Sequence, residues 1–235
     1  MASSVYVLDT TKRIKIGDKL QILKFICAHK KISTFVLLFV IFICLGFCLY
    51  IKQNQKAREL LLANTREVAL KITQNAQIGD LIFRKGMNVE SDIITYISHS
   101  PFSHIGMVVS LEPFSVIHAT TDDDKNALNQ VIISSLEDFL AQAKVVGLKR
   151  LDLPQETRLK IAQDSLNYLT KPFVLSTDST RFYCTTFLLD MILQKTEFEV
   201  EFINVDFAFL GGEYLFPSAF WNHKKTLKIL DISEL

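Results

Sequence analysis

The stretch RFYCTTFLLD, Arg181 to Asp190, carries the single cysteine of the last 187 residues of the chain. Two residues that can cap a helix, Ser179 and Thr180, come just before it, and an apolar run follows. This pattern predicts a helix from about 181 to 194 with Cys184 in its first turn. There the helix dipole favours a thiolate, and unbonded backbone N–H groups can hold an oxyanion. Cys184 is therefore either a nucleophile or, as buried cysteines usually are, a small hydrophobic residue.

A nucleophilic cysteine needs a base, and two of the five histidines are placed to supply one. His104 and His118 lie on two segments rich in Val and Ile, 104–110 and 114–120, which we expect to form a β-hairpin. Antiparallel pairing would bring the imidazoles to opposite or diagonal positions, about 5 to 8 Å apart. One could then orient the other, as a carboxylate or Asn does in other cysteine hydrolases. Two ordinary strand histidines are the simpler interpretation, and a zinc site would lack ligands.

The charge composition argues against nucleic acid as a partner, because the formal net charge is only +1 with 22% charged residues. Many of the hydrophobic residues gather in STFVLLFVIFICLGFCLYI, Ser33 to Ile51, which contains no charged residue. A helix of that length spans about 28 Å, close to the hydrocarbon core of a bilayer. The segment is therefore predicted to be a transmembrane helix. A cleaved signal peptide is the alternative, but no A-x-A cleavage site follows.

Basic residues outnumber acidic ones before the predicted span. This favours a single-pass inner membrane protein with a cytoplasmic N-terminus and a periplasmic or extracytoplasmic catalytic domain. The chain then divides into a cytoplasmic segment 1–32, the transmembrane helix 33–51, a juxtamembrane helix 52–77 and a catalytic domain 78–235. Cysteine usage agrees with this division, because Cys184 has no disulfide partner inside the predicted domain.

Short β-like runs alternate with short helical patterns in the predicted domain, which is typical of an α+β fold with an antiparallel sheet. Besides the hairpin, the expected elements are a strand at 81–83, a helix at 91–100 capped by Ser91, a strand from 131 followed by a short helix capped by Ser134 or Ser135, a strand at 145–151, a helix at 154–169, and a turn at Gly211-Gly212.

Four motifs follow one another in the order GDLIFRKG, SHIGMVV, VIHAT and FYCTTFLLDMI. In this they resemble the YiiX/YebB-like cysteine hydrolases, which are circularly permuted papain-like enzymes of the NlpC superfamily. The resemblance runs from about Ile78 to Leu230. It implies that Cys184 is the nucleophile, His104 the general base and His118 the third, orienting residue. The similar lecithin:retinol acyltransferase group also has a second histidine there.

Two positions depart from the pattern of the family that the chain resembles. Many relatives have Cys-Ser-Glu where this chain has Cys184-Thr185-Thr186, which removes a carboxylate one helical turn from the thiol. Many also have Glu where His118 stands. Glu and His can both accept a hydrogen bond from an imidazole, so His118 can still orient His104. The change at Thr185-Thr186 bears on the class of substrate instead.

The expected reaction is acyl transfer through a thioester, with no cofactor or metal. The backbone N–H of Cys184 and a second donor, for which Tyr183 is a candidate, would hold the oxyanion. The expected substrate is an amide bond, in a peptidoglycan stem peptide of the bacterial cell wall. An acyl-amide or ester of a membrane lipid is the alternative, and a catalytically inactive binding module is another. A lipid acyl channel would be bordered by Phe198, Phe202, Phe207 and Phe209.

Overall fold

The computed structural model describes residues 16–121, 129–207 and 210–235. The chain divides into two compact units, Met1–Glu59 and Leu60–Leu235, and each is described by itself. A long helix, α1 (Ile16–Asn75), begins in the first unit and ends in the second.

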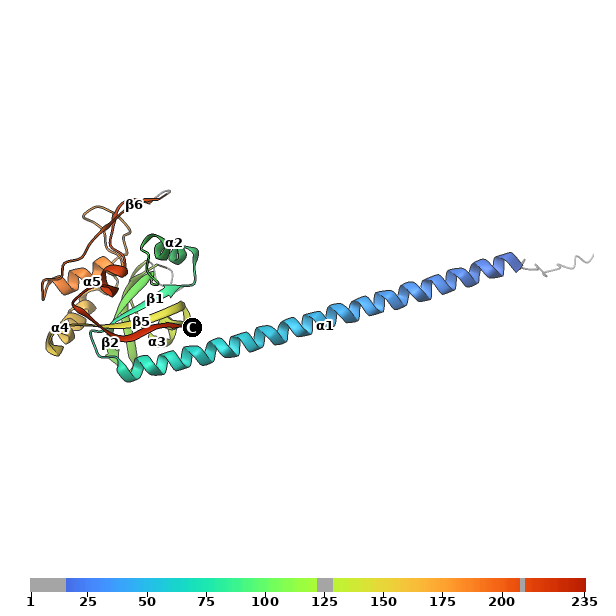
Figure 1. Cartoon of the computed structure of the whole chain (residues 1–235), viewed down its shortest axis with the longest axis horizontal. Coiled ribbons are helices and arrows are strands. Elements are labelled where there is room, and N and C mark those ends of the chain that lie inside the picture. The colour runs from blue at the N-terminus through green and yellow to red at the C-terminus, as the bar shows by residue number, and fades with distance from the viewer. Residues whose placement is uncertain (1–15, 122–128, 208–209) are drawn as a thin grey trace, which may run out of the picture. The chain divides into compact units, whose positions relative to one another are not determined.

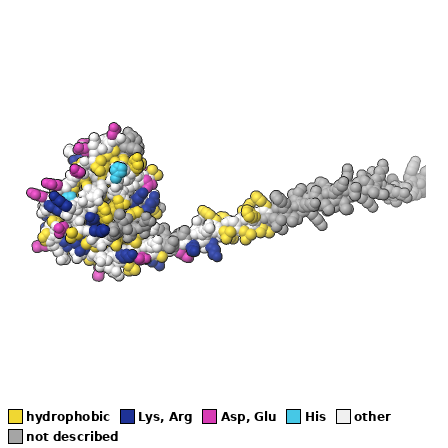
Figure 2. Space-filling view, in the orientation of Figure 1, with side chains coloured by type: hydrophobic (Ala, Val, Ile, Leu, Met, Phe, Trp, Pro, Cys, Tyr) yellow, Lys and Arg dark blue, Asp and Glu magenta, His cyan; other side chains and the backbone are white. Residues whose placement is uncertain are grey.

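The predicted membrane span, 33–51, falls within α1, but the side chains of 33–38 and of residue 40 lie outside the described residues. Over the side chains that are described, no helix reaches the length and hydropathy of a membrane span. The large apolar side chains from Ile41 to Ile51 are exposed, and Figure 2 shows them in yellow along the helix.

The second unit is built on a six-stranded sheet in which all neighbouring strands are antiparallel, in the order β4-β3-β2-β1-β5-β8 (Figure 1). Its strands are β1 (Leu81–Gly86), β2 (His104–Leu111), β3 (Phe114–Thr120), β4 (Gln130–Ser135), β5 (Ala143–Leu151) and β8 (Thr226–Glu234). A separate ribbon pairs β6 (Ile203–Phe207) with β7 (Leu210–Tyr214). The predicted α+β class with an antiparallel sheet is therefore confirmed.

The shorter helices cover the sheet, with α4 and α5 on the left of it in Figure 1. They are α2 (Val89–Ile97), α3 (Leu136–Ala141), α4 (Gln155–Ser165), a 3-10 turn (Leu166–Tyr168), α5 (Cys184–Leu193) and α6 (Ser218–Trp221).

Each face of the sheet has its own hydrophobic core, because successive residues of a strand point to opposite sides. On β1, Phe83 lies in a core with Phe187 of α5. Its neighbour Ile82 lies in a second core with Ile72 of α1 and Phe139 of α3. The last turns of α1 therefore belong to the packed fold of the second unit.

The helix α5 begins three residues later than the sequence predicts. Phe182 is still extended and pairs with Val174 in an isolated bridge. Tyr183 is the N-cap, and its backbone N–H donates to the Oγ1 of Thr186 at 2.8 Å. The serine and threonine predicted as caps lie upstream of that bridge. Cys184 is thus the first helical residue, and the hydroxyl of Thr186 accepts a backbone N–H at the helix start.

Two other predicted boundaries are wrong for local reasons. The helix α2 begins at Val89, because the Oδ1 of Asn88 accepts the N–H of Ser91 at 3.0 Å and caps the helix three residues before the expected cap, Ser91. The glycines Gly211 and Gly212, predicted to form a turn, lie inside β7 and pair with β6. Gly212 has a φ of +114°, which suits a strand that twists at a glycine.

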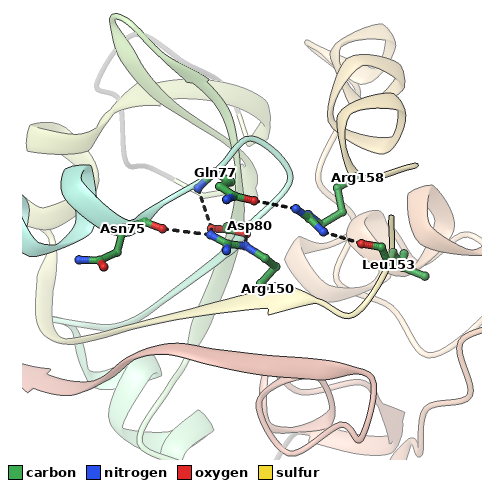
Figure 3. Close-up of polar contacts among 6 residues, drawn as sticks. All are labelled: Asn75, Gln77, Asp80, Arg150, Leu153 and Arg158. Carbon is green, nitrogen blue, oxygen red and sulfur yellow. Dashed lines mark hydrogen bonds and ion pairs between the residues drawn. The ribbon is translucent and has the colours of Figure 1, made fainter. Parts of the chain in front are cut away.

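A polar junction ties the end of α1 to the sheet, and Figure 3 shows it in close-up. The fully buried carboxylate of Asp80 accepts two hydrogen bonds of 2.8 Å from Arg150 and one of 2.7 Å from the N–H of Gln77. Arg150 also donates to the carbonyl of Asn75 at 3.0 Å. Arg158 of α4 donates to the Oε1 of Gln77 at 2.6 Å. Asp80 therefore has a structural role at the turn between α1 and β1.

Candidate active site

The β2–β3 hairpin brings the two predicted histidines together. Met107 faces Ile117 in the register of the hairpin, so His104 and His118 occupy diagonal positions on the same face. The Nε2 of His104 lies 2.9 Å from the Nδ1 of His118, and the two rings meet edge to face at 79°. His118 is completely buried, whereas His104 is partly exposed to a cavity.

The cysteine lies on α5, which packs against the opposite face of β2 and β3. Cys184 and His104 line the same cavity, of about 300 Å³. The backbone N–H groups of Ile105, Thr185 and Cys184 itself act on the thiol and lower its pKa. Because the Nε2 of His104 is bonded to His118, its Nδ1 is the ring nitrogen left for the thiol.

Burial dominates the electrostatics of the cysteine. It raises the pKa of Cys184 to about 11, while the surrounding N–H groups and the charge of Arg84 lower it by less. The N–H groups at the helix start favour the thiolate, but the desolvation of the sulfur outweighs them, so the thiol form predominates in the resting site. The cysteine rests as a thiol and needs a base to become a nucleophile.

Both imidazoles are held in the neutral form that such a base requires. Burial, and then the charges of Arg84 and His118, place the pKa of His104 well below its ordinary value. Burial and the charge of Arg84 do the same to the pKa of His118. A neutral His104 can accept the thiol proton at neutral pH.

Arg84 is a site residue that the sequence reasoning missed. It stands opposite His104 in the register of β1 and β2, lines the cavity, and is almost fully buried. Its Nη1 donates to the carbonyl of Phe139 at 3.0 Å, and its guanidinium carbon lies 4.5 Å from the centre of that ring. An arginine at the end of the apolar run LIF was the only signal in the sequence.

Tyr183 is the residue predicted as a candidate oxyanion donor. It precedes the cysteine, is buried, and lines the same cavity. Its hydroxyl accepts the N–H of Leu215 at 2.9 Å. Burial raises the pKa of Tyr183, so the hydroxyl keeps the proton that it would donate.

Apolar side chains make up most of the cavity wall away from the catalytic pair. They come from the β1–α2 loop, α2, the loop before α5, and the segment from β6 to α6, namely Met87, Ile94, Ile97, Phe173, Leu175, Val205, Tyr214, Leu215, Phe216 and Pro217. The wall therefore suits an apolar group next to the thiol.

The phenylalanines predicted to border a lipid channel do not form this wall where they are described. Phe198 stacks on Phe220 and on His223, and Phe202 lies under the guanidinium of Arg181. The side chain of Phe207 and the whole of Phe209 lie outside the described residues. Other residues supply the apolar wall instead.

No group of three His, Cys, Asp or Glu side chains that could hold a metal ion occurs in the part of the chain that the structure describes.

Comparison with known proteins bears on the same region. Residues 75–228 match a family described as permuted papain-like amidase enzymes, YaeF/YiiX, family C92. The fold is similar to the crystal structure of the metalloprotein YiiX from Escherichia coli O157:H7, with a TM-score of 0.55 and 20% sequence identity. That similarity covers 67% of this chain and 98% of the other. No curated protein sequence matches the chain significantly.

Proposed function

The chain belongs to the permuted papain-like amidase family C92, a family of cysteine hydrolases, and from that premise we propose that it cleaves an amide or ester bond through a thioester on Cys184. One observation carries the proposal. A histidine whose Nε2 is fixed at 2.9 Å by a second histidine shares a cavity with the thiol at the start of α5. This is the base, the orienting group and the nucleophile of a cysteine hydrolase.

In the first step, the Nδ1 of His104 takes the thiol proton while the sulfur of Cys184 attacks the carbonyl carbon. The tetrahedral intermediate collapses when the imidazolium gives its proton to the leaving amine or alcohol, which leaves a thioester. In the second step, His104 takes a proton from water, and the hydroxide adds to the thioester carbonyl. Collapse of that intermediate releases the acid and returns the proton to the sulfur.

Two donors support the oxyanion in this proposal. The backbone N–H of Cys184 is one, because the first N–H groups of a helix have no intrahelical acceptor. The hydroxyl of Tyr183 is the other, since it accepts a hydrogen bond from Leu215 and still has its own proton to donate. His118 stays neutral and keeps His104 in position.

The apolar wall favours an acyl group as the part of the substrate that enters the cavity, so an acyl-amide or ester of a lipid is the substrate class that we propose. The peptidoglycan stem peptide expected from the sequence would need polar partners for its backbone amides along the wall. It remains the competing substrate in the experiment below.

A membrane location supports the same choice of substrate. We propose that the uncharged segment 33–51 anchors the chain, with the N-terminus in the cytoplasm and the catalytic domain outside. The exposed apolar side chains of α1 between Ile41 and Ile51 suit contact with lipid. A reporter fused after Leu235 tests the orientation, because it should be active only when it lies outside the cytoplasm.

The decisive experiment labels the full chain with an activity-based thiol probe and measures competition. We expect Cys184 to be labelled and an acyl lipid to protect it, while soluble peptidoglycan fragments protect it less. Cys184→Ala should abolish turnover and the part of the labelling that the acyl lipid prevents, so that any remaining label lies on Cys27, Cys44 or Cys48. Labelling that survives in Cys184→Ala at the same rate would contradict the proposed nucleophile, and stronger protection by the fragments would contradict the proposed substrate.

A further inference from the structure

Ser134 of β4 lies at the far end of the histidine pair, although the hydrolase mechanism does not involve it. His118 faces Ile132 in the register of β3 and β4, which puts Ser134 diagonal to it. The Nε2 of His118 lies 2.9 Å from the Oγ of Ser134, while its Nδ1 lies 2.9 Å from His104. Both His118 and Ser134 are buried. The hydroxyl is thus the last member of a hydrogen-bonded line that starts at His104.

The protons along this line can be assigned from one end to the other. A neutral imidazole has one N–H donor and one acceptor nitrogen. If the Nδ1 of His104 is to take the thiol proton, its own proton must sit on Nε2 and point at the Nδ1 of His118. The proton of His118 must then sit on Nε2 and point at Ser134. His104 can therefore act as the base only when the hydroxyl of Ser134 accepts the Nε2–H of His118.

The reverse direction is unproductive for the same reason. If the hydroxyl of Ser134 donates, the proton of His118 sits on Nδ1 and points at the Nε2 of His104. That nitrogen is then the acceptor, so the proton of His104 sits on Nδ1, facing the thiol. A histidine in this tautomer cannot take the proton of Cys184.

Both histidines must be neutral for the assignment to hold, and their surroundings favour this. The ring of Phe139 packs edge to face on His118 at 5.3 Å between centroids, and the guanidinium of Arg84 lies over the same ring. An imidazolium would therefore be buried beside a fixed positive charge, which lowers the pKa of both histidines.

We propose that Ser134 is a positioning residue that accepts the Nε2–H of His118 and so holds both imidazoles in the tautomers that leave the Nδ1 of His104 free to take the proton of Cys184. The proposal rests on the function proposed above. It also distinguishes two adjacent serines. The hydroxyl of Ser135 accepts the N–H of Asp138 at 3.0 Å and caps α3, whereas Ser134 faces the site.

Removal of the Ser134 hydroxyl should move the protons of His118 and His104 from Nε2 to Nδ1. In Ser134→Ala the Nε2–H of His118 loses the hydroxyl oxygen that accepts it. A buried N–H that loses its acceptor costs more than a ring nitrogen that loses a donor, so the other tautomer is favoured. We expect the reactivity of Cys184 to fall about 10-fold to 10²-fold, because a lost buried hydrogen bond shifts an equilibrium by that range. Ser134→Thr keeps the hydroxyl and should stay within about threefold of the wild type.

The test uses the full chain with nitrogen-15-labelled histidine and reads the tautomers from the imidazole nitrogen shifts. The wild type should carry its protons on Nε2 of both His104 and His118, and Ser134→Ala should move them to Nδ1. In parallel, mass spectrometry of the Cys184 peptide gives the rate of alkylation by iodoacetamide. Ser165→Ala, which removes a buried hydroxyl in α4, is the matched control and should change neither.

Each result decides the proposal. A wild-type His118 with its proton on Nδ1 overturns it, even if no variant folds. So do unchanged tautomers and an unchanged alkylation rate in Ser134→Ala, or a Ser134→Thr variant as slow as Ser134→Ala. A separate result tests the proposed function, namely the alkylation rate of Cys184 in His104→Ala. If Cys184 reacts as fast in His104→Ala as in the wild type, the proposed function fails.

Discussion

At the residue scale, the buried thiol has a measurable signature. Because burial raises the pKa of Cys184 to about 11, the rate of its alkylation should keep rising above pH 9, where an ordinary thiol levels off. The unfolded chain serves as control, since its cysteines have lost that burial and their alkylation rate should be half-maximal at about pH 8.5. A plateau below pH 8 in the folded chain would show that the thiolate already predominates at rest.

Replacement of His118 should separate orientation from chemistry. His118→Gln keeps a side chain that can accept a hydrogen bond from His104 and should retain part of the activity. His118→Ala should lose on the order of 10²-fold in kcat, because the imidazole of His104 is no longer held in place. Steady-state kinetics on a chain that folds normally measure both. Turnover of His118→Ala at the wild-type rate would show that another group orients the base.

The hydroxyl of Tyr183 can be removed with little change in shape. Tyr183→Phe keeps the ring in its buried position but loses the proposed oxyanion donor, so kcat should fall by about 10² to 10³ with little change in KM. The accepting oxygen for Leu215 is lost as well, so the melting temperature must be measured beside the kinetics. A rise in KM of the same size, with kcat unchanged, would show that the hydroxyl contributes to ground-state binding instead.

The site residues that could be predicted are those of residue types that occur rarely in the chain. A lone cysteine at a helix start and two histidines across a hairpin suggest their partners through spacing and resemblance. Arg84 and Ser134 give no such signal, because an arginine and a serine are ordinary on a strand. Their roles come from strand register and burial, which bring side chains together from β1, β2, β3 and β4.

At the scale of elements, hydrophobic periodicity predicted the types of the segments better than their ends. The hairpin, the helix that carries the cysteine and the helix after Pro154 are all present. The start of α5 was misplaced because a backbone bridge at Phe182, a contact with a distant residue, keeps the chain extended past the local capping residues. The strand β8 was missed, since it is assigned by its pairing with β5.

The turn between α1 and β1 depends on one glycine. Gly79 has a φ of +86°, and a Cβ there would lie 2.7 Å from the backbone oxygen of Arg158. Gly79→Ala should therefore lower the free energy of unfolding by about 2 kcal/mol or more, from strain and crowding together. Chemical denaturation measures this. Gly211→Ala, where a Cβ meets nothing within 4 Å, is the control and should be close to neutral.

At the scale of the whole molecule, stability should depend on pH through the buried histidines. The pKa values of His104 and His118 in the folded state lie well below the ordinary value of 6.5. Below about pH 6.5 the unfolded chain therefore binds more protons than the folded one, and the free energy of unfolding falls as the pH is lowered. Thermal melts between pH 8 and pH 5 should show a falling melting temperature.

The variant His118→Gln identifies the source of that pH dependence. It removes one of the two histidines that must stay neutral, so its melting temperature should fall less steeply between pH 6.5 and pH 5 than that of the wild type. His223→Gln gives a comparison, because His223 is nearer the surface and burial lowers its pKa too. An identical slope for His118→Gln and the wild type would show that other groups govern the acid transition.

The family and the fold of the catalytic domain were predictable from the order of four motifs, and the family match over residues 75–228 confirms that prediction. The order of cysteine and histidine along the chain is what a circular permutation changes, so it is visible without a structure. The anchor at 33–51 and its orientation stay predictions. The shape of the cavity was out of reach of the sequence, because its wall combines side chains from segments more than 100 residues apart.

The Asp80 junction has a mechanical consequence. Arg150 on β5 bonds both the carbonyl at the end of α1 and the carboxylate at the start of β1. A force applied along α1 would therefore reach two neighbouring strands at once, and the ladder between β1 and β5 would carry it as shear over many parallel hydrogen bonds. The same turn also bonds to β2, because the N–H of Gly79 donates to the carbonyl of Val108 at 2.8 Å and the N–H of Val108 donates to the carbonyl of Asp80 at 2.9 Å. Tension on the helix would therefore also reach the hairpin that carries the two histidines.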